Sequence, residues 1–489
     1  MDRFEIHQLP DNLTTLIVDA SYYYVPAAVE HHLLSSSAPG RAGKLIINRA
    51  ATRLPESLGR LTALTTLFIC YYTALTALPE SLGKLEALTV LNIFCCRALT
   101  GLPESVSGLT MLTTLTLSHS SALLRLPDSL CQLAALTRLD LDECYALTSL
   151  PESLGQLTAL TTLTLCGCRA LTRLPESLGQ LAALTTLSLP PCLHVMPGWI
   201  VRLTALATLQ LSFDRFLTEL PASLGELAML STLRLSHCSA LLRLPGSLGQ
   251  LAALTALYLD DCYTLTSLSE SFGQLAALTN LHISNCGALK ELPESLGQLT
   301  ALKTLRLILC PITRLPGSLG QLTTLTKLAI GYCTSLTELP DSLGKLTTLT
   351  TLDLLRCEKL LELPESLGQL AILSTLEISC CVALTRLPES LGQLAMLETL
   401  YINYCRALTR LPFSLAFLPA IQEAQVTGLS DLVFPPCTVA AQGFPAIKAY
   451  LFAHNHPFKM LLLILTARRR RVRHPPPELW GLIWDEYFG

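Results

Sequence analysis

Charged and aromatic side chains recur at alternating positions along this chain, and they are its best candidates for chemistry. Most equivalent positions hold Thr, Ser or Ala. On a rigid surface, charged and aromatic side chains anchor a protein partner. The alternative, that they are solvated residues which an exposed strand tolerates, stays open. The candidate partner-binding residues are Arg138, Asp140, Asp142, Arg234, Tyr258, Asp260, Arg306, Lys327, Asp353 and Tyr401.

Catalysis, metal binding and nucleotide binding each lack their residue pattern. His237 and His282 are candidate bases, but the sequence places no evident nucleophile beside either one. Adjacent cysteines, such as Cys95 and Cys96, do not repeat the C-x₂-C spacing of a structural zinc site. The phosphate-binding pattern G-x-x-x-x-G-K-[ST] is missing. We therefore expect a protein that is not an enzyme, with no catalytic residue, no cofactor and no metal ion.

A repeat of 24 residues must position the candidate anchors. Residues 150–173, LPESLGQLTALTTLTLCGCRALTR, recur with little change, and their proline marks each copy. The steps between these prolines are 24 residues, except for a step of 22 from Pro175 to Pro197 and one of 23 from Pro293 to Pro316, and Ser269 takes the place of the one missing proline. A fixed period of this size predicts a solenoid, in which each unit buries its apolar side against its neighbours.

Each repeat contains two predicted elements. Leu163 and Leu165 alternate with polar residues, which predicts a short strand with both leucines pointing inward. Pro151 and the following ESLGQ predict one turn of 3₁₀ or α-helix, because Gly155 follows too soon for a long helix. Stacked copies predict an α/β solenoid with a parallel sheet on one side and short turns on the other. Sixteen to seventeen coils, about 4.8 Å apart, give a long surface rather than a pocket.

The pattern LxxLxLxxC followed by LxxLP resembles the leucine-rich repeat consensus over residues 54–434. It is most similar to the intracellular type of 23 to 24 residues seen in plant immune receptors and Ras-pathway scaffold proteins. The resemblance implies a right-handed horseshoe whose concave sheet holds a protein partner, in signalling or defence. The immune receptors carry a nucleotide-binding module before their repeats, and this sequence shows none.

The eighteen cysteines indicate the cellular compartment, and the low charge limits the classes of partner. Twelve cysteines occupy one place in the repeat, where a reduced thiol fills space and donates weakly. Such a ladder favours a reducing compartment, and the polar start MDRFEIHQLPDN is not typical of a signal peptide. We therefore expect a cytoplasmic protein. The formal net charge of −3 gives no overall attraction to nucleic acid. The predicted ladder comprises Cys96, Cys144, Cys168, Cys192, Cys238, Cys262, Cys286, Cys310, Cys333, Cys357, Cys381 and Cys405.

Four segments follow from these patterns. Residues 1–53 are a predicted N-terminal cap with a degenerate repeat, in which Leu45 and Ile47 form the strand that follows the first one. Residues 54–434 are the array, and 435–453 a capping helix with the apolar stripe Ala446, Ile447, Tyr450 and Leu451. Residues 454–489 are an Arg-rich linker and a short amphipathic helix.

The last segment carries the remaining predictions. Its apolar run of six residues is far shorter than the roughly 20 that a membrane span needs. The run from Arg468 to Arg473 is a linker or a nuclear import signal. PPELWGLIWDEY resembles the first helix of an F-box, which implies an alternative function: a ubiquitin-ligase substrate receptor that meets the ligase adaptor through this tail.

Overall fold

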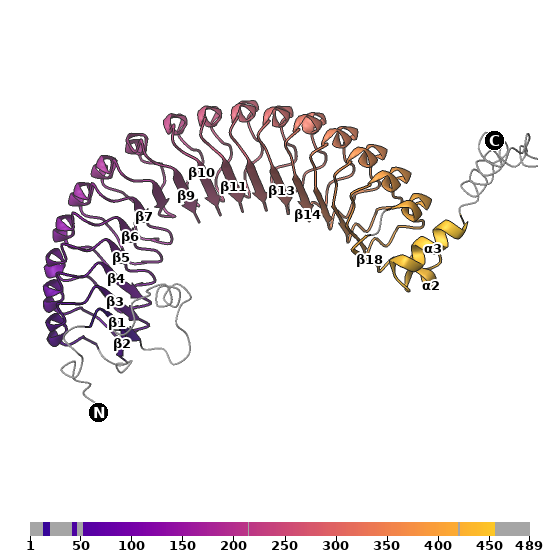
Figure 1. Cartoon of the computed structure of the whole chain (residues 1–489). Coiled ribbons are helices and arrows are strands. Elements are labelled where there is room, and N and C mark those ends of the chain that lie inside the picture. The colour runs from indigo at the N-terminus through magenta and orange to yellow at the C-terminus, as the bar shows by residue number, and fades with distance from the viewer. Residues whose placement is uncertain (1–12, 20–41, 46–51, 214, 419–420, 455–489) are drawn as a thin grey trace, which may run out of the picture. The chain divides into compact units, whose positions relative to one another are not determined.

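The computed structural model describes residues 13–19, 42–45, 52–213, 215–418 and 421–454. The chain divides into two units, residues 1–289 and 290–489. Both units repeat one coil, which consists of a short strand, a turn and a five-residue 3₁₀ helix. Within each unit the strands line the inner side of the curve and the 3₁₀ helices the outer side (Figure 1). The predicted α/β solenoid is therefore confirmed.

The strands of the first unit pair in parallel, and from β3 to β12 they follow the order of the sequence. They are β1 (Thr15–Asp19), β2 (Ala42–Leu45), β3 (Thr66–Cys70), β4 (Val90–Phe94), β5 (Thr114–Thr116), β6 (Arg138–Asp140), β7 (Thr162–Thr164), β8 (Thr186–Leu189), β9 (Thr208–Ser212), β10 (Thr232–Ser236), β11 (Ala256–Asp260) and β12 (Asn280–Ser284).

The first strands of this unit depart from the sequence order. Strand β1 pairs directly with β3, and β2 pairs with the other side of β1. The segment at Leu45 is thus a strand, as predicted, but it lies outside β1 instead of between β1 and β3. Ile47 lies outside the described residues.

The second unit continues the same coil and ends in two helices. Its parallel strands are β13 (Thr304–Ile308), β14 (Lys327–Gly331), β15 (Thr351–Leu355), β16 (Thr375–Ser379), β17 (Thr399–Asn403) and β18 (Glu423–Thr427). Helices α2 (Cys437–Ala440) and α3 (Phe444–His454) follow β18. Ile447 and Leu451 of α3 are fully buried, and Phe452 meets Phe417 edge to face. No helix in the described part of the chain is long and apolar enough to cross a membrane.

A 3₁₀ helix forms the outer side of each coil, and all but one begin directly after a proline. Those of the first unit are η2 (Glu56–Arg60), η3 (Glu80–Lys84), η4 (Glu104–Gly108), η5 (Asp128–Gln132), η6 (Glu152–Gln156), η7 (Glu176–Gln180), η8 (Gly198–Arg202), η9 (Ala222–Glu226), η10 (Gly246–Gln250) and η11 (Glu270–Gln274). Those of the second unit are η12 (Glu294–Gln298), η13 (Gly317–Gln321), η14 (Asp341–Lys345), η15 (Glu365–Gln369), η16 (Glu389–Gln393) and η17 (Phe413–Phe417).

Packing between coils leaves no room for a side chain at a glycine such as Gly155 in the outer helices. A side chain at Gly155 of η6 would place its Cβ 2.3 Å from the carbonyl oxygen of Ser177 in η7. On the inner side, Leu163 and Leu165 are fully buried, as predicted, and each buried leucine contributes about 1.5–3 kcal/mol. Directly before several strands, a threonine hydroxyl donates to a carbonyl one coil earlier, as Thr113 Oγ1 does to Thr89 at 3.0 Å.

Eleven of the twelve predicted ladder cysteines are buried, and none of the eighteen cysteines forms a disulfide. The Cys168 thiol donates to the carbonyl oxygen of Leu141 at 3.1 Å, and burial raises its pKa to about 12. Cys192 is the exception, because it is only partly buried. Ladder cysteines follow a residue with positive φ, such as His237 at 56°. Pro191 holds that place before Cys192, and its ring fixes a negative φ.

Candidate functional site

The candidate anchors lie on the inner sheet, where parallel pairing aligns equivalent residues of successive strands. In the first unit, Arg234 of β10 pairs with Tyr258 of β11, and Tyr258 pairs with His282 of β12. The Arg234 guanidinium lies 3.8 Å from the centroid of the Tyr258 ring, a cation–π contact. The neighbouring strands thus fix two of the predicted anchors against each other.

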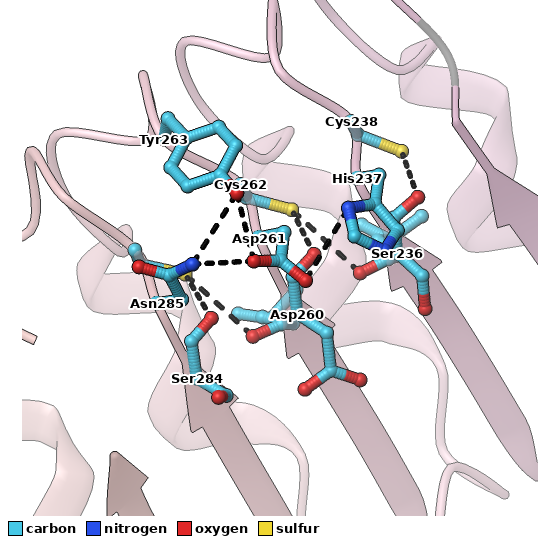
Figure 2. Close-up of polar contacts among 12 residues, drawn as sticks. Ser236, His237, Cys238, Asp260, Asp261, Cys262, Tyr263, Ser284 and Asn285 are labelled. Atoms are coloured by element: carbon cyan, nitrogen blue, oxygen red, sulfur yellow. Dashed lines mark hydrogen bonds and ion pairs between the residues drawn. The ribbon is translucent and has the colours of Figure 1, made fainter. Parts of the chain in front are cut away.

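Two histidine–aspartate pairs extend this row toward the ends of the strands. His282 Nε2 lies 3.2 Å from Asp260 Oδ1, and His237 Nδ1 lies 3.3 Å from Asp261 Oδ2. Figure 2 shows the Asp261 carboxylate between His237, Tyr263 and Asn285. Together with the contacts described above, these residues form one group, which we call the β10–β12 cluster. It comprises Arg234, His237, Tyr258, Asp260, Asp261, Tyr263, His282 and Asn285.

Hydrogen bonds hold the acidic side of the β10–β12 cluster in place. The Tyr263 hydroxyl donates to Asp261 Oδ1 at 2.9 Å, and this bond raises the pKa of the tyrosine. The Asn285 amide donates to the same oxygen. The side chains of Asp260 and Asp261 remain 28% and 23% exposed, so they are held in position yet stay accessible to a partner.

A second group of acids surrounds β6. The Asp142 backbone N–H donates to Asp140 Oδ1 at 3.0 Å, and Glu143 Oε2 lies 2.6 Å from His119 Nδ1. Burial raises the pKa of Asp142, and the nearby carboxylates of Asp140 and Glu143 raise it further. Arg138, at the start of the strand, is exposed. The structure therefore brings the three predicted residues of this coil to one part of the sheet.

In the second unit, the predicted residues occupy the middle position of their strands or the start. Asp353 of β15 pairs with Glu377 of β16, which pairs with Tyr401 of β17. Burial raises the pKa of Asp353, as does Glu377, while Lys327 and Arg306 oppose the shift. Arg306 and Lys327 are exposed on β13 and β14. This unit thus combines two exposed cations with a half-buried acid.

Comparisons with known proteins agree with this architecture. A family model for a leucine-rich repeat region matches residues 269–361. A leucine-rich repeat protein of Leptospira interrogans is 27% identical over 78% of this chain and 88% of its own, with a TM-score of 0.57. The leucine-rich repeat domain of the type III effector XopL is 30% identical over 48% of this chain and 78% of its own, with a TM-score of 0.42.

The chain belongs to the leucine-rich repeat family. An internalin from Listeria monocytogenes, 18% identical over 65% of this chain and 88% of its own, has a TM-score of 0.47. No curated protein matches the sequence. Leucine-rich repeat proteins are generally non-enzymatic scaffolds for protein recognition. Among the described residues, no group of three or more His, Cys, Asp and Glu side chains is placed to hold a metal ion.

Sequence reasoning missed one row of side chains on this leucine-rich repeat sheet. Thirteen described residues other than glycine have positive φ; eleven of them directly follow a strand, and His119 and Glu143 lie three residues after one. Their N–H groups donate to the next coil, as His119 does to the Asp142 carbonyl at 2.8 Å. The chain turns there, and side chains such as Phe213 and His237 stack face to face, with centroids 4.4 Å apart. The only signal in the sequence is that this position, next to the ladder cysteine, varies from coil to coil.

Proposed function

We propose that this leucine-rich repeat protein is a non-enzymatic recognition scaffold that binds a protein partner on its inner sheet. The observation that carries the proposal is the β10–β12 cluster, where a cation, an aromatic ring and two acids are fixed by contacts between strands yet remain accessible. Anchors that are held in place before binding lose less conformational entropy on association. We propose that the ten predicted residues contact the partner, each on the inner sheet of its own unit, together with the other residues of the β10–β12 cluster in the first unit.

Two further aspects belong to this proposal. We infer that the protein acts in the cytoplasm, in signalling or defence, because none of the buried ladder thiols forms a disulfide. We also propose that residues 1–53 and 435–453 cap the array. Residues 455–489 lie outside the described part of the chain, so the Arg468–Arg473 run and the F-box-like helix stay sequence-based predictions.

Affinity capture with two charge-reversed variants tests the inner sheet. The first variant, Asp140→Lys/Asp260→Lys, changes acids on β6 and β11. We expect it to lose the partners that the native chain captures from its source, because like charges then face the partner's cations. The matched control, Glu86→Lys/Glu226→Lys, changes exposed acids near η3 and η9 and should capture the native set. If both variants captured the same partners as the native chain, the inner sheet would not be the binding site.

A further inference from the structure

The short coil between Pro175 and Pro197 opens a notch on the side of the first unit. Six residues lie between Cys168 and Pro175, but only four lie between Cys192 and Pro197. Leu174 beside the notch is partly exposed, as Leu102 is in a regular coil, whereas the corresponding Leu150 and Leu220 are 7% and 4% exposed. A pocket of about 560 Å³ results, lined by Thr172, Arg173, Leu174, Leu193, His194, Val195 and Pro197.

The notch exposes backbone groups that most regular coils pair. Along this side, backbone N–H groups donate to the preceding coil, as Thr148 does to Leu124 at 3.3 Å and Leu242 does to Thr218 at 3.0 Å. Within the described part of the chain, Thr172 and His194 make no such bond at the corresponding positions, nor do residues such as Thr218 after the notch and Thr409 in the second unit. Backbone groups left open between coils are a template for an extended peptide, which pairs with them as an added strand does.

The side chains around the notch determine which peptide would fit. Val195 is 77% exposed, and the His194 ring stacks on the 48% exposed Phe216 ring with centroids 4.7 Å apart. Arg173 is exposed, and no acid lines the pocket. The acids on neighbouring coils have basic partners of their own, since Glu176 pairs with Arg202 and Glu219 with Arg243. The notch therefore combines polar and apolar lining residues, and the charge of Arg173 has no acid beside it in that lining.

We propose that this notch binds an extended segment of a partner protein in which an acidic residue lies beside a large apolar residue. The acid pairs with the Arg173 guanidinium, in a charge-assisted contact. The apolar side chain lies against Leu174 and Val195, and the backbone of the segment bonds to Thr172 and His194. The notch lies on the side of the coils rather than on the inner sheet, so this binding is independent of the function proposed above.

A random peptide library displayed on phage tests the notch directly. The library is first depleted on the variant Arg173→Glu/Val195→Asp and then selected on the native full-length chain. Depletion removes peptides that bind the inner sheet, which the variant retains. Both substituted side chains are exposed, and circular dichroism verifies that the variant is folded. We expect the surviving peptides to contain Asp or Glu beside Leu, Ile, Phe or Trp.

Fluorescence anisotropy on synthetic copies of the survivors provides the decisive controls. Their affinity should fall about tenfold or more on the notch variant, a loss of about 1.4 kcal/mol. The variant Arg125→Glu/Ser149→Asp makes the same changes at the equivalent positions of two regular coils and should bind as the native chain does. The inner-sheet variant Asp140→Lys/Asp260→Lys should also bind them unchanged. No survivors, survivors without the acidic–apolar pair, or equal binding to the notch variant would each overturn the proposal.

Discussion

Asp142, close to β6, is an acid whose ionised form lowers the stability of the folded chain. Its pKa is raised from 3.8 because burial disfavours the ionised form, and Asp140 adds repulsion. As pH rises through the usual carboxyl range, the unfolded chain releases this proton more readily than the folded chain. The free energy of unfolding therefore falls with pH until the folded-state pKa is passed. A cation of the partner would stabilise the ionised form of this acid, which is consistent with the proposed binding surface.

The pH dependence of two variants tests this assignment. Relative to the native chain, Asp142→Asn should become more stable as pH rises from about 4 to about 7, because the penalised charge is gone. Glu294→Gln should show the opposite trend, since bonds from Ser318 lower the Glu294 pKa and stabilise the ionised form only in the folded state. Urea unfolding at several pH values measures both. Parallel trends for the two variants would contradict the assignment.

At the scale of the element, the close contact between 3₁₀ helices is the feature with the sharpest test. Gly155→Ala should lower the free energy of unfolding by about 1–3 kcal/mol, because the new Cβ meets the Ser177 carbonyl and the coils must separate. Gly198→Ala in η8 is the matched control, as no atom lies within 4 Å of the added Cβ. Urea unfolding of both variants measures the difference. Equal losses would show that propensity, and not the contact between coils, sets the cost.

The repeated elements were predictable from the sequence because each depends on local spacing. The alternation of Leu163 and Leu165 predicts a strand in every coil, and Pro151 before ESLGQ predicts the helical turn. The position of β2 outside β1 was not predictable, because pairing between strands far apart in the chain leaves no local pattern. The incomplete burial of Cys192 was not predicted, because the residue is a cysteine as in the other coils. Pro191 could have indicated it, since proline cannot adopt the positive φ of the residue before a ladder cysteine.

The candidate site was predictable only in part. Alternation places Tyr258 and Asp260 outward on β11, but it says nothing of which strand supplies their contacts. The pairing of His282 with Asp260 depends on the register between β11 and β12. The positive-φ row was not predictable either, because residues such as Phe213 and Leu309 seldom adopt this conformation and give no glycine signal. Neighbouring coils impose it by accepting the N–H group that the turn exposes.

At the scale of the whole molecule, the thiol ladder reports on folding along the array. Native protein should react quickly with a thiol reagent at only a few sites, led by the exposed Cys437. Burial raises the pKa of Cys96 and of Cys333 to about 12, so few reactive thiolates form. In denaturant, all eighteen thiols should react. The absorbance of the released reagent counts the thiols that have reacted. Rapid reaction of all eighteen thiols in the native protein would contradict a buried ladder, and fewer than eighteen reacting thiols in denaturant would contradict a reduced one.

The threonine bonds between coils have a consequence for how such a chain can change in length. Thr89, Thr113, Thr137 and Thr161 each donate to the equivalent carbonyl one coil earlier. If one coil were excised, the next would meet the same acceptor on the coil before, and the severed junction would close with identical bonds. Duplication or loss of one regular coil in the gene therefore keeps these threonine bonds at the new junction. The array can change its number of coils without losing this repeated contact.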